Sequence, residues 1–459
     1  MSVLTNPAAM SRNLTLDFFR GVALLIIFIN HVPENEALLF TPSRFGLSDA
    51  AEIFVFASGF AAALAYGKTF RAAGLALGSL RVFHRCGQIY AAHLALFGLL
   101  AVTCVLGNSL LDTRDYITHL NIRYFFDDTE DALRSLLALR YVPHYFDILP
   151  MYLVIMLWIP GVLAVAQIGR GLAMTLPVGV YLAMWVWDLE FLADPVGDRP
   201  WFFNPFGWQL IFFIGYAFGA GWLRPPPPTR TLVVLSLAII ALSLPLSPEP
   251  ELRPTVFLQE LHASLLPWLE KTRFGPLRLV HFLALAYLAS VVFRGPQLWL
   301  SRPAGRLIVQ MGQQSLPIFL LSMVLSYVGG MVFDLVGHHP LSIVAINLGG
   351  IAIMILFGAL LVWLKSSPWK RLDPMGNAAG SRATGAGGLW PADSVSWRRW
   401  VERAAAMTVV LAVSAGPILL GDRRASPPAP ADVILAGDEW TAARVSLERS
   451  VVPGVAEAP

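Results

Sequence analysis

Long apolar runs dominate this chain and decide what it can fold into. Runs of about 18 or more residues recur along most of its length, and each can cross roughly 30 Å of hydrocarbon as a helix. Only 14% of the 459 residues are charged, whereas a typical soluble domain has about 25%. We therefore predict an all-α, polytopic membrane bundle of about ten transmembrane helices. The predicted spans are 14–32, 50–67, 86–107, 146–167, 172–188, 206–222, 231–246, 277–293, 307–331 and 341–364.

The first apolar run is expected to remain in the mature protein. It extends past the length of a signal-peptide core and contains Asp17 and Arg20 near its start, which a cleaved signal would not. Residues 1–13 then form a short N-terminal segment, and residues 14–365 form the membrane domain. Prolines inside the later spans predict kinks, at Pro150, Pro160, Pro177 and Pro317.

The C-terminal part has a different composition. Residues 366–403 are rich in Gly, Ala, Ser and Trp, which predicts a linker. Residues 404–421 form a further Ala-rich apolar run, and the sequence leaves open whether this run is an eleventh span. Residues 422–459 have little apolar material for a core and are expected to be disordered.

Basic residues predict the orientation. With the N-terminus in the cytoplasm, the even-numbered loops are cytoplasmic, and they are short and rich in Lys and Arg, as the positive-inside rule requires. The residues concerned are Lys68, Arg71, Arg81, Arg85, Arg170, Arg224, Arg230, Arg294, Arg302 and Arg306. We predict a multi-pass protein of the bacterial inner membrane, in contact with lipid. A net charge of +3 is too small to indicate a nucleic-acid partner.

Cysteine spacing and the absence of known motifs exclude several classes of site. Cys86 and Cys104 fall on one predicted helix about 27 Å apart, too far for a disulfide. The sequence has no zinc spacing, Walker loop or dinucleotide fingerprint, so no metal and no permanently bound cofactor are expected. It also shows no internal repeat of the kind that many transporters have.

Two loops on the predicted outer side contain amphipathic stretches. Residues 129–141 begin with Thr129 as a helix cap, and residues 255–270 carry spaced aromatic and aliphatic side chains. They are interpreted as helices lying in the membrane interface, or as walls of a groove for an extracytoplasmic substrate.

The first span carries the sharpest candidate site. Asp17 and Arg20 stand near its start, and His31 follows Arg20 by eleven positions. Eleven helical positions rotate through three turns and about 20°, so Arg20 and His31 share one face about 16 Å apart. Asp17 is one turn before Arg20 and can pair with it. Ionisable residues inside a membrane are functional candidates by default; the alternative is an interfacial anchor.

These residues carry a family resemblance. The stretch Leu16-Asp17-Phe18-Phe19-Arg20-Gly21, with His31 after it, resembles the signature of acyltransferase family 3, and within it the OpgC type, which succinylates osmoregulated periplasmic glucans. Further similar stretches are Gly46–Glu52, Phe56–Phe60, Phe203–Leu210 and Gly312–Leu316. The resemblance covers about residues 12–365. It departs where many members have a histidine and this chain reads Phe319-Leu320-Leu321-Ser322.

The resemblance implies transfer of an acyl group from cytoplasmic acyl-CoA, expected to be succinyl-CoA, to a hydroxyl of a periplasmic glucan. His31 would be the base that takes the hydroxyl proton, and an acyl-histidine intermediate is the open alternative. Arg20, Arg81 and Arg85 would hold the CoA, because guanidinium groups suit phosphates. For Arg81 and Arg85, membrane anchoring is an equal alternative.

Other polar residues are expected near the same region. Asp49 and Glu52 open the second span, where a carboxylate could orient the His31 imidazole, although the two also fit a helix capping box. Candidates for the substrate region, with packing or interhelical hydrogen bonds as the alternative, are His93, His144, Asp147 and Gln209.

Two other functions remain open on the sequence. The same chemistry could serve a different acceptor, such as another envelope glycan or a lipid. Alternatively, Arg20, His31, Asp49 and Glu52 could form the gate of a proton-coupled transporter.

Overall fold

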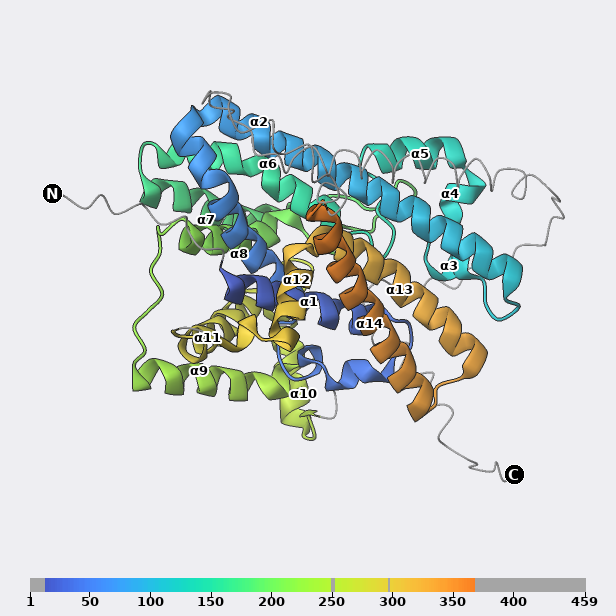
Figure 1. Cartoon of the computed structure of the whole chain (residues 1–459). Coiled ribbons are helices and arrows are strands. Elements are labelled where there is room, and N and C mark those ends of the chain that lie inside the picture. The colour runs from blue at the N-terminus through green and yellow to red at the C-terminus, as the bar shows by residue number, and fades with distance from the viewer. Residues whose placement is uncertain (1–12, 249–251, 296–297, 368–459) are drawn as a thin grey trace, which may run out of the picture.

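The computed structural model describes residues 13–248, 252–295 and 298–367, and this part of the chain is built from helices with no strand (Figure 1). The predicted all-α class is confirmed. The predictions for residues 1–12, for the linker, for the eleventh span and for the tail lie outside the described residues.

The helices are α1 (Leu14–His31), α2 (Ala50–Leu110), α3 (Tyr116–His119), α4 (Arg123–Asp127), α5 (Thr129–Leu137), α6 (Ile148–Ala166), α7 (Arg170–Trp187), α8 (Pro205–Gly219), α9 (Arg230–Ser243), α10 (Val256–Leu269), α11 (Pro276–Val292), α12 (Pro303–Gln313), α13 (Ser315–Val336) and α14 (Pro340–Lys365). Short 3-10 turns lie at Glu36–Phe40, Pro42–Arg44, Leu244–Leu246 and Leu298–Ser301.

Several helices have the dimensions of membrane spans. Among the described residues, five are long and apolar enough to cross a bilayer: α1, α2, α6, α13 and α14. The helices α9 and α11 are apolar but shorter. These helices fit a membrane protein, and the number of about ten spans stays a prediction.

The second and third predicted spans form one long element. Both limbs of α2 run on through residues 68–85, which the sequence analysis placed in a loop, and they meet at a bend at the upper left of Figure 1. Gly74 makes the bend with φ 78°. Only glycine takes this positive φ without steric cost, so the chain reverses direction without unwinding either limb. Cys86 and Cys104 lie in the second limb as free, buried thiols.

The ninth predicted span, 307–331, is wrong as one helix. It is divided at Gln314, which has φ −110° and separates α12 from α13. Pro317 accounts for the break, because a proline ring clashes with the carbonyl group of the residue four positions earlier in a helix. Pro317 therefore lies in the first turn of α13, and Pro150 likewise lies in the first turn of α6, where a missing N–H costs no hydrogen bond. The kinks expected at these two prolines are not needed.

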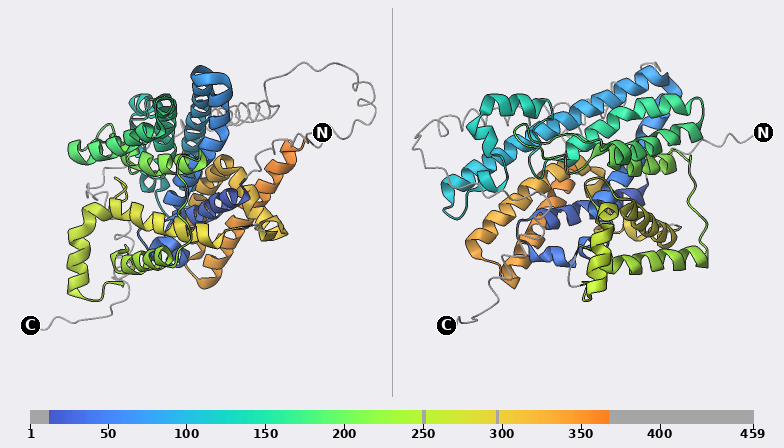
Figure 2. Two further views of the ribbon diagram at one scale, coloured as in Figure 1. Left: turned by 90° about the vertical axis from the view of Figure 1, so that its left-hand side faces the viewer. Right: turned by 180° about the vertical axis from the view of Figure 1, so that it is seen from behind.

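The loop helices differ in detail from the prediction. Asp128, and not Thr129, caps α5, because its side chain accepts the N–H of Asp131. Leu133 and Leu137 are exposed on α5, as a helix in the membrane interface would have them. The helix α10 exposes Phe257 and runs across the direction of α9 (Figure 2).

The first helix lies inside the bundle, in contact with α2, α12, α13 and α14 (Figure 1). We call the end where α1 begins the proximal end and the end where it finishes, at His31, the distal end. The α2 bend is at the proximal end, because the first limb starts at Ala50 on the distal side.

Glycines let α1 and α12 approach closely. A Cβ atom added to Gly312 would overlap the backbone oxygen of Asp17, and one added to Gly21 would overlap that of Ile308. Small residues at helix crossings allow backbone contact of this kind in membrane proteins. This contact fixes the start of α1, and hence Arg20, against α12.

We expect Gly312→Ala to lower the free energy of unfolding by about 1–3 kcal/mol, because overpacking forces α1 and α12 apart. The matched control is Gly349→Ala on α14, where an added Cβ meets nothing within 4 Å. The midpoint of thermal unfolding in detergent, followed by tryptophan fluorescence, compares the two variants. Equal midpoints for both variants and wild type would contradict the close contact.

Candidate functional site

His31 is the last residue of α1, at the distal end. Its Nδ1 lies 2.7 Å from the carbonyl oxygen of Ile27, one helical turn earlier. A carbonyl only accepts, so Nδ1 carries the proton, and in the neutral ring Nε2 keeps the lone pair that a base needs. The ring packs edge-on against Tyr145 with centroids 5.4 Å apart. The structure thus fixes both the tautomer and the plane of the imidazole.

Asp49 and Glu52 form the capping box of α2, which confirms that alternative. The Asp49 carboxylate accepts the N–H of Ala51 at 2.8 Å, and Glu52 Oε2 accepts the N–H of Asp49 at 2.8 Å. Neither carboxylate orients the imidazole directly, since the Ile27 carbonyl holds Nδ1. Their effect on His31 is therefore electrostatic, and Asp49 is within range.

Each carboxylate is also paired with a cation from the segment around α11. Lys271 Nζ lies 2.6 Å from Asp49 Oδ2, and Arg278 donates two hydrogen bonds, of 2.9 and 2.6 Å, to Glu52 Oε1. Glu52 is fully buried, and the side chain of Arg278 is 7% exposed. Burial raises the pKa of Asp49, but Lys271 and Arg278 outweigh burial and hold that pKa well below its ordinary value.

Lys271 is the member of this network that stays accessible. Its side chain is 27% exposed, and its charge acts on His31. The ammonium lies 5.7 Å from the ring centre of Phe202 and 5.8 Å from that of Phe203, so aromatic faces and one carboxylate hold it. An ammonium has three donors, and one is used on Asp49.

His281 and Ser48 extend the network. His281 Nδ1 lies 2.7 Å from Ser48 Oγ, both residues are buried, and His281 Nε2 has no hydrogen-bond partner among the described residues. Gly46 leaves the space that this imidazole fills, because a Cβ atom there would collide with the ring.

Arg20 is half-buried and lies three turns before His31 on α1, toward the proximal end. It donates to Ser315 Oγ at the first residue of α13, directly after the break at Gln314. Its charge and that of Arg85 both reach Tyr152 on α6. Asp17 is buried against Gly312, and its pairing with Arg20 stays a prediction.

Arg81 and Arg85 lie on the second limb of α2 and contact their own helix. Arg81 donates to Thr69 and stacks over the ring of Tyr66, with 5.7 Å between guanidinium carbon and ring centre. Arg85 donates to Gln88 at 2.9 Å. The charge of Arg85 also reaches Tyr66, so Arg20, Arg81 and Arg85 lie around one pair of tyrosines, Tyr66 and Tyr152.

Of the four residues expected in the substrate region, three lie near Phe146: His93 packs against its ring, and His144 and Asp147 flank it in the chain. Gln209 is fully buried and donates to the carbonyls of Pro177, at 2.7 Å, and Phe206, so its amide joins α7 to α8. Asp147 accepts the N–H of Phe202 at 3.1 Å. His93 is buried beside Phe146 with neither ring nitrogen hydrogen-bonded in the described structure.

His144 is half-buried in the loop before α6, and its neighbour Tyr145 reaches the His31 ring. A role in substrate binding for His93, His144, Asp147 and Gln209 stays a prediction.

A protein-family model described as OpgC protein matches residues 12–366. The chain belongs to the OpgC family. No curated protein and no solved structure matches it. The resemblance found at the first helix is confirmed, while the wider link to acyltransferase family 3 stays a prediction. Membership of the OpgC family implies a glucan-modifying acyltransferase in a membrane.

In this OpgC family member, sequence analysis missed the cations that pair with Asp49 and Glu52 and the histidine beside them. Lys271, Arg278 and His281 were not proposed, although Arg278 lies inside the predicted span 277–293, where an ionisable residue is costly unless it is paired or used. A second distal cluster was also missed: Arg114 contacts Asp334 at 2.9 Å. No group of three or more His, Cys, Asp or Glu suited to a metal lies within the described residues.

Proposed function

We propose that this protein is a membrane O-acyltransferase that moves a succinyl group from cytoplasmic acyl-CoA to a hydroxyl of a periplasmic glucan. We place it in the bacterial inner membrane with the proximal end in the cytoplasm. The observation that carries the proposal is His31, whose Nδ1 is held by Ile27 at the distal end of a chain that belongs to the OpgC family.

The proposed reaction uses His31 as the general base. Its Nε2 takes the proton of the glucan hydroxyl while the oxygen attacks the thioester carbonyl. The new C–O bond forms, the C–S bond breaks, and the CoA thiolate leaves with the proton that the imidazolium returns. The products are the glucan ester and CoA with a free thiol. In the alternative, His31 Nε2 itself attacks the thioester and releases CoA, and the glucan hydroxyl then attacks the acyl-His31 intermediate, breaking its C–N bond and restoring the imidazole.

The paired charges at the distal end, Asp49 with Lys271 and Glu52 with Arg278, support the oxyanion and the imidazolium that form in this reaction. Lys271 has ammonium donors beyond the one on Asp49, and it is the accessible cation of the network within range of His31. In the proposal it faces the oxyanion that forms on the acyl carbonyl, where a fixed donor stabilises developing charge. Arg278 and Glu52 are buried together and position Asp49, which in turn positions Lys271.

The two ends of the bundle support the proposed orientation. The proximal end carries Arg20, Arg81 and Arg85, which suit the phosphates of a cytoplasmic donor, and the distal end carries His31. The charge pattern of the loops supports this direction.

The deciding experiment is mass spectrometry of periplasmic glucans from a deletion strain that carries either wild type or empty vector. We expect wild type alone to raise the glucan mass by one succinyl group for each ester formed. An unchanged glucan together with an altered envelope glycan or lipid would move the acceptor. No acyl change in any envelope component would overturn the proposed function.

A further inference from the structure

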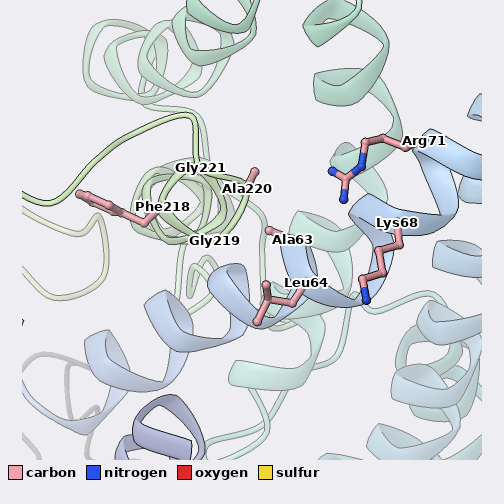
Figure 3. Close-up of a pocket in the computed structure, with 8 residues that line it drawn as sticks. All are labelled: Ala63, Leu64, Lys68, Arg71, Phe218, Gly219, Ala220 and Gly221. Carbon is pink, nitrogen blue, oxygen red and sulfur yellow. The ribbon is translucent and has the colours of Figure 1, made fainter. Parts of the chain in front are cut away.

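A cavity of about 260 Å³ opens at the proximal end, between the first limb of α2 and the end of α8 (Figure 3). It is lined by Ala63, Leu64, Lys68, Arg71, Phe218, Gly219, Ala220 and Gly221. Figure 3 shows Lys68 and Arg71 on the α2 side and the turn Gly219–Gly221 across from them. The space beside the turn is open, because a Cβ atom added to Gly221 would meet nothing within 4 Å.

The cavity is lined by two exposed cations, Lys68 and Arg71, and by no acidic residue of the described chain. Lys68 and Arg71 form no ion pair and no hydrogen bond within the part of the chain that the structure describes. The guanidinium of Arg71 turns back toward Gly67, and its charge reaches Tyr216 on α8, so it lies between the two helices.

This differs from the cations of the distal end. There Lys271 is paired with Asp49, and Arg278 with Glu52. Anchoring at the bilayer surface explains a single exposed cation, and the negative end of the α8 dipole attracts one nearby. Neither effect accounts for the concave space that both side chains line. A bound anion would satisfy both.

We propose that this cavity binds the phosphate groups of an anionic ligand through Lys68 and Arg71. The identity of the ligand rests on the proposed function: it is the acyl-CoA donor, held by its phosphorylated nucleotide end. Arginine gives phosphate two parallel hydrogen bonds, and lysine adds a compact charge. The cavity is slightly smaller than typical pockets of about 300–1,000 Å³, so it holds one end of the ligand.

The position of the cavity suits a long donor. Lys68 follows Asp49 by nineteen residues on the same limb of α2, which corresponds to about 28 Å along the helix axis. Phosphates held at Lys68 leave the thioester at the other end of an extended arm, directed toward the distal end. Arg20 and Arg85, which both reach Tyr152, would then contact the diphosphate and the pantetheine arm that follow the nucleotide end.

The test measures binding of CoA, and separately of pantetheine, which lacks the phosphates, to full-length protein in phosphatidylcholine nanodiscs. We expect Lys68→Gln with Arg71→Gln to weaken CoA binding about tenfold or more, since each lost bond is to a charged group. Pantetheine binding should not change. Lys68→Arg with Arg71→Lys, which keeps both charges, should retain most of the CoA affinity. The matched control is Arg170→Gln, which removes a basic residue outside the cavity.

Two results separate the outcomes. If the double Gln variant loses retention of phosphatidylglycerol but binds CoA as wild type does, the phosphate site stands and its ligand is a lipid headgroup. If it binds both as wild type does, the site is overturned, while wild-type turnover of acyl-CoA still upholds the proposed function. Failure of wild type to turn over acyl-CoA overturns the proposed function instead, and the phosphate site is then judged by binding alone.

Discussion

Replacing His31 by alanine is expected to reduce acyl transfer about 10²–10⁴-fold, the range that a positioned general base contributes. The reduction should appear in the rate at saturating donor, because His31 acts on the acceptor hydroxyl and does not contact the CoA phosphates in the proposed mechanism. Purified enzyme with acyl-CoA and isolated glucan, followed by thiol release and by product mass, gives that rate directly.

The controls for His31 are chosen to separate chemistry from folding. His31→Gln keeps a polar side chain of similar size but has no titratable nitrogen, so it should be as inactive as His31→Ala. His84→Ala removes an exposed histidine of α2 far from the distal end and should retain the wild-type rate. If His31→Ala works as well as wild type at equal membrane level, His31 is not the base, and the first helix is an anchor.

The helices could be predicted because membrane insertion imposes a simple rule on each segment. A run of about 20 apolar residues must satisfy its own backbone hydrogen bonds, and so it forms a helix whatever its neighbours are. The rule says nothing about how helices connect. That is why the bend at Gly74, where both limbs stay helical, and the break at Gln314 were not foreseen.

The candidate site was predicted where its residues share one helix or stand at the adjoining ends of consecutive spans, as His31 and Asp49 do. Arg20 and His31 are related by helical rotation, which a single sequence shows. The partners of Asp49 and Glu52 lie more than two hundred residues later, and no spacing rule links Lys271 or Arg278 to them. The tautomer of His31 also depends on the backbone carbonyl oxygen of Ile27. Every residue has such an oxygen, so the sequence does not reveal this contact.

The Glu52–Arg278 pair gives the second large effect, on stability. Arg278→Met would leave the Glu52 carboxylate in a site with no exposed surface, and Glu52→Gln would leave the guanidinium without its counterion. Removal of one partner of a buried pair costs about 3–5 kcal/mol, because the remaining charge is neither hydrated nor paired. Thermal unfolding in detergent, followed by tryptophan fluorescence, should show both single variants unfolding at clearly lower temperature than wild type.

The double variant separates the net contribution of this pair from the cost of an orphaned charge. Glu52→Leu with Arg278→Met removes both charges, so its stability should return close to that of wild type. Its transferase activity should nevertheless stay low, because Glu52 Oε2 no longer accepts the Asp49 N–H and Lys271 loses its positioned partner.

The control is Arg273→Met, which breaks the exposed contact with Asp188 and should lower the free energy of unfolding by less than about 1 kcal/mol. Single variants as stable as wild type would show that the pair is not buried as described. A double variant with full activity would show that the network stabilises the fold and does not position the site.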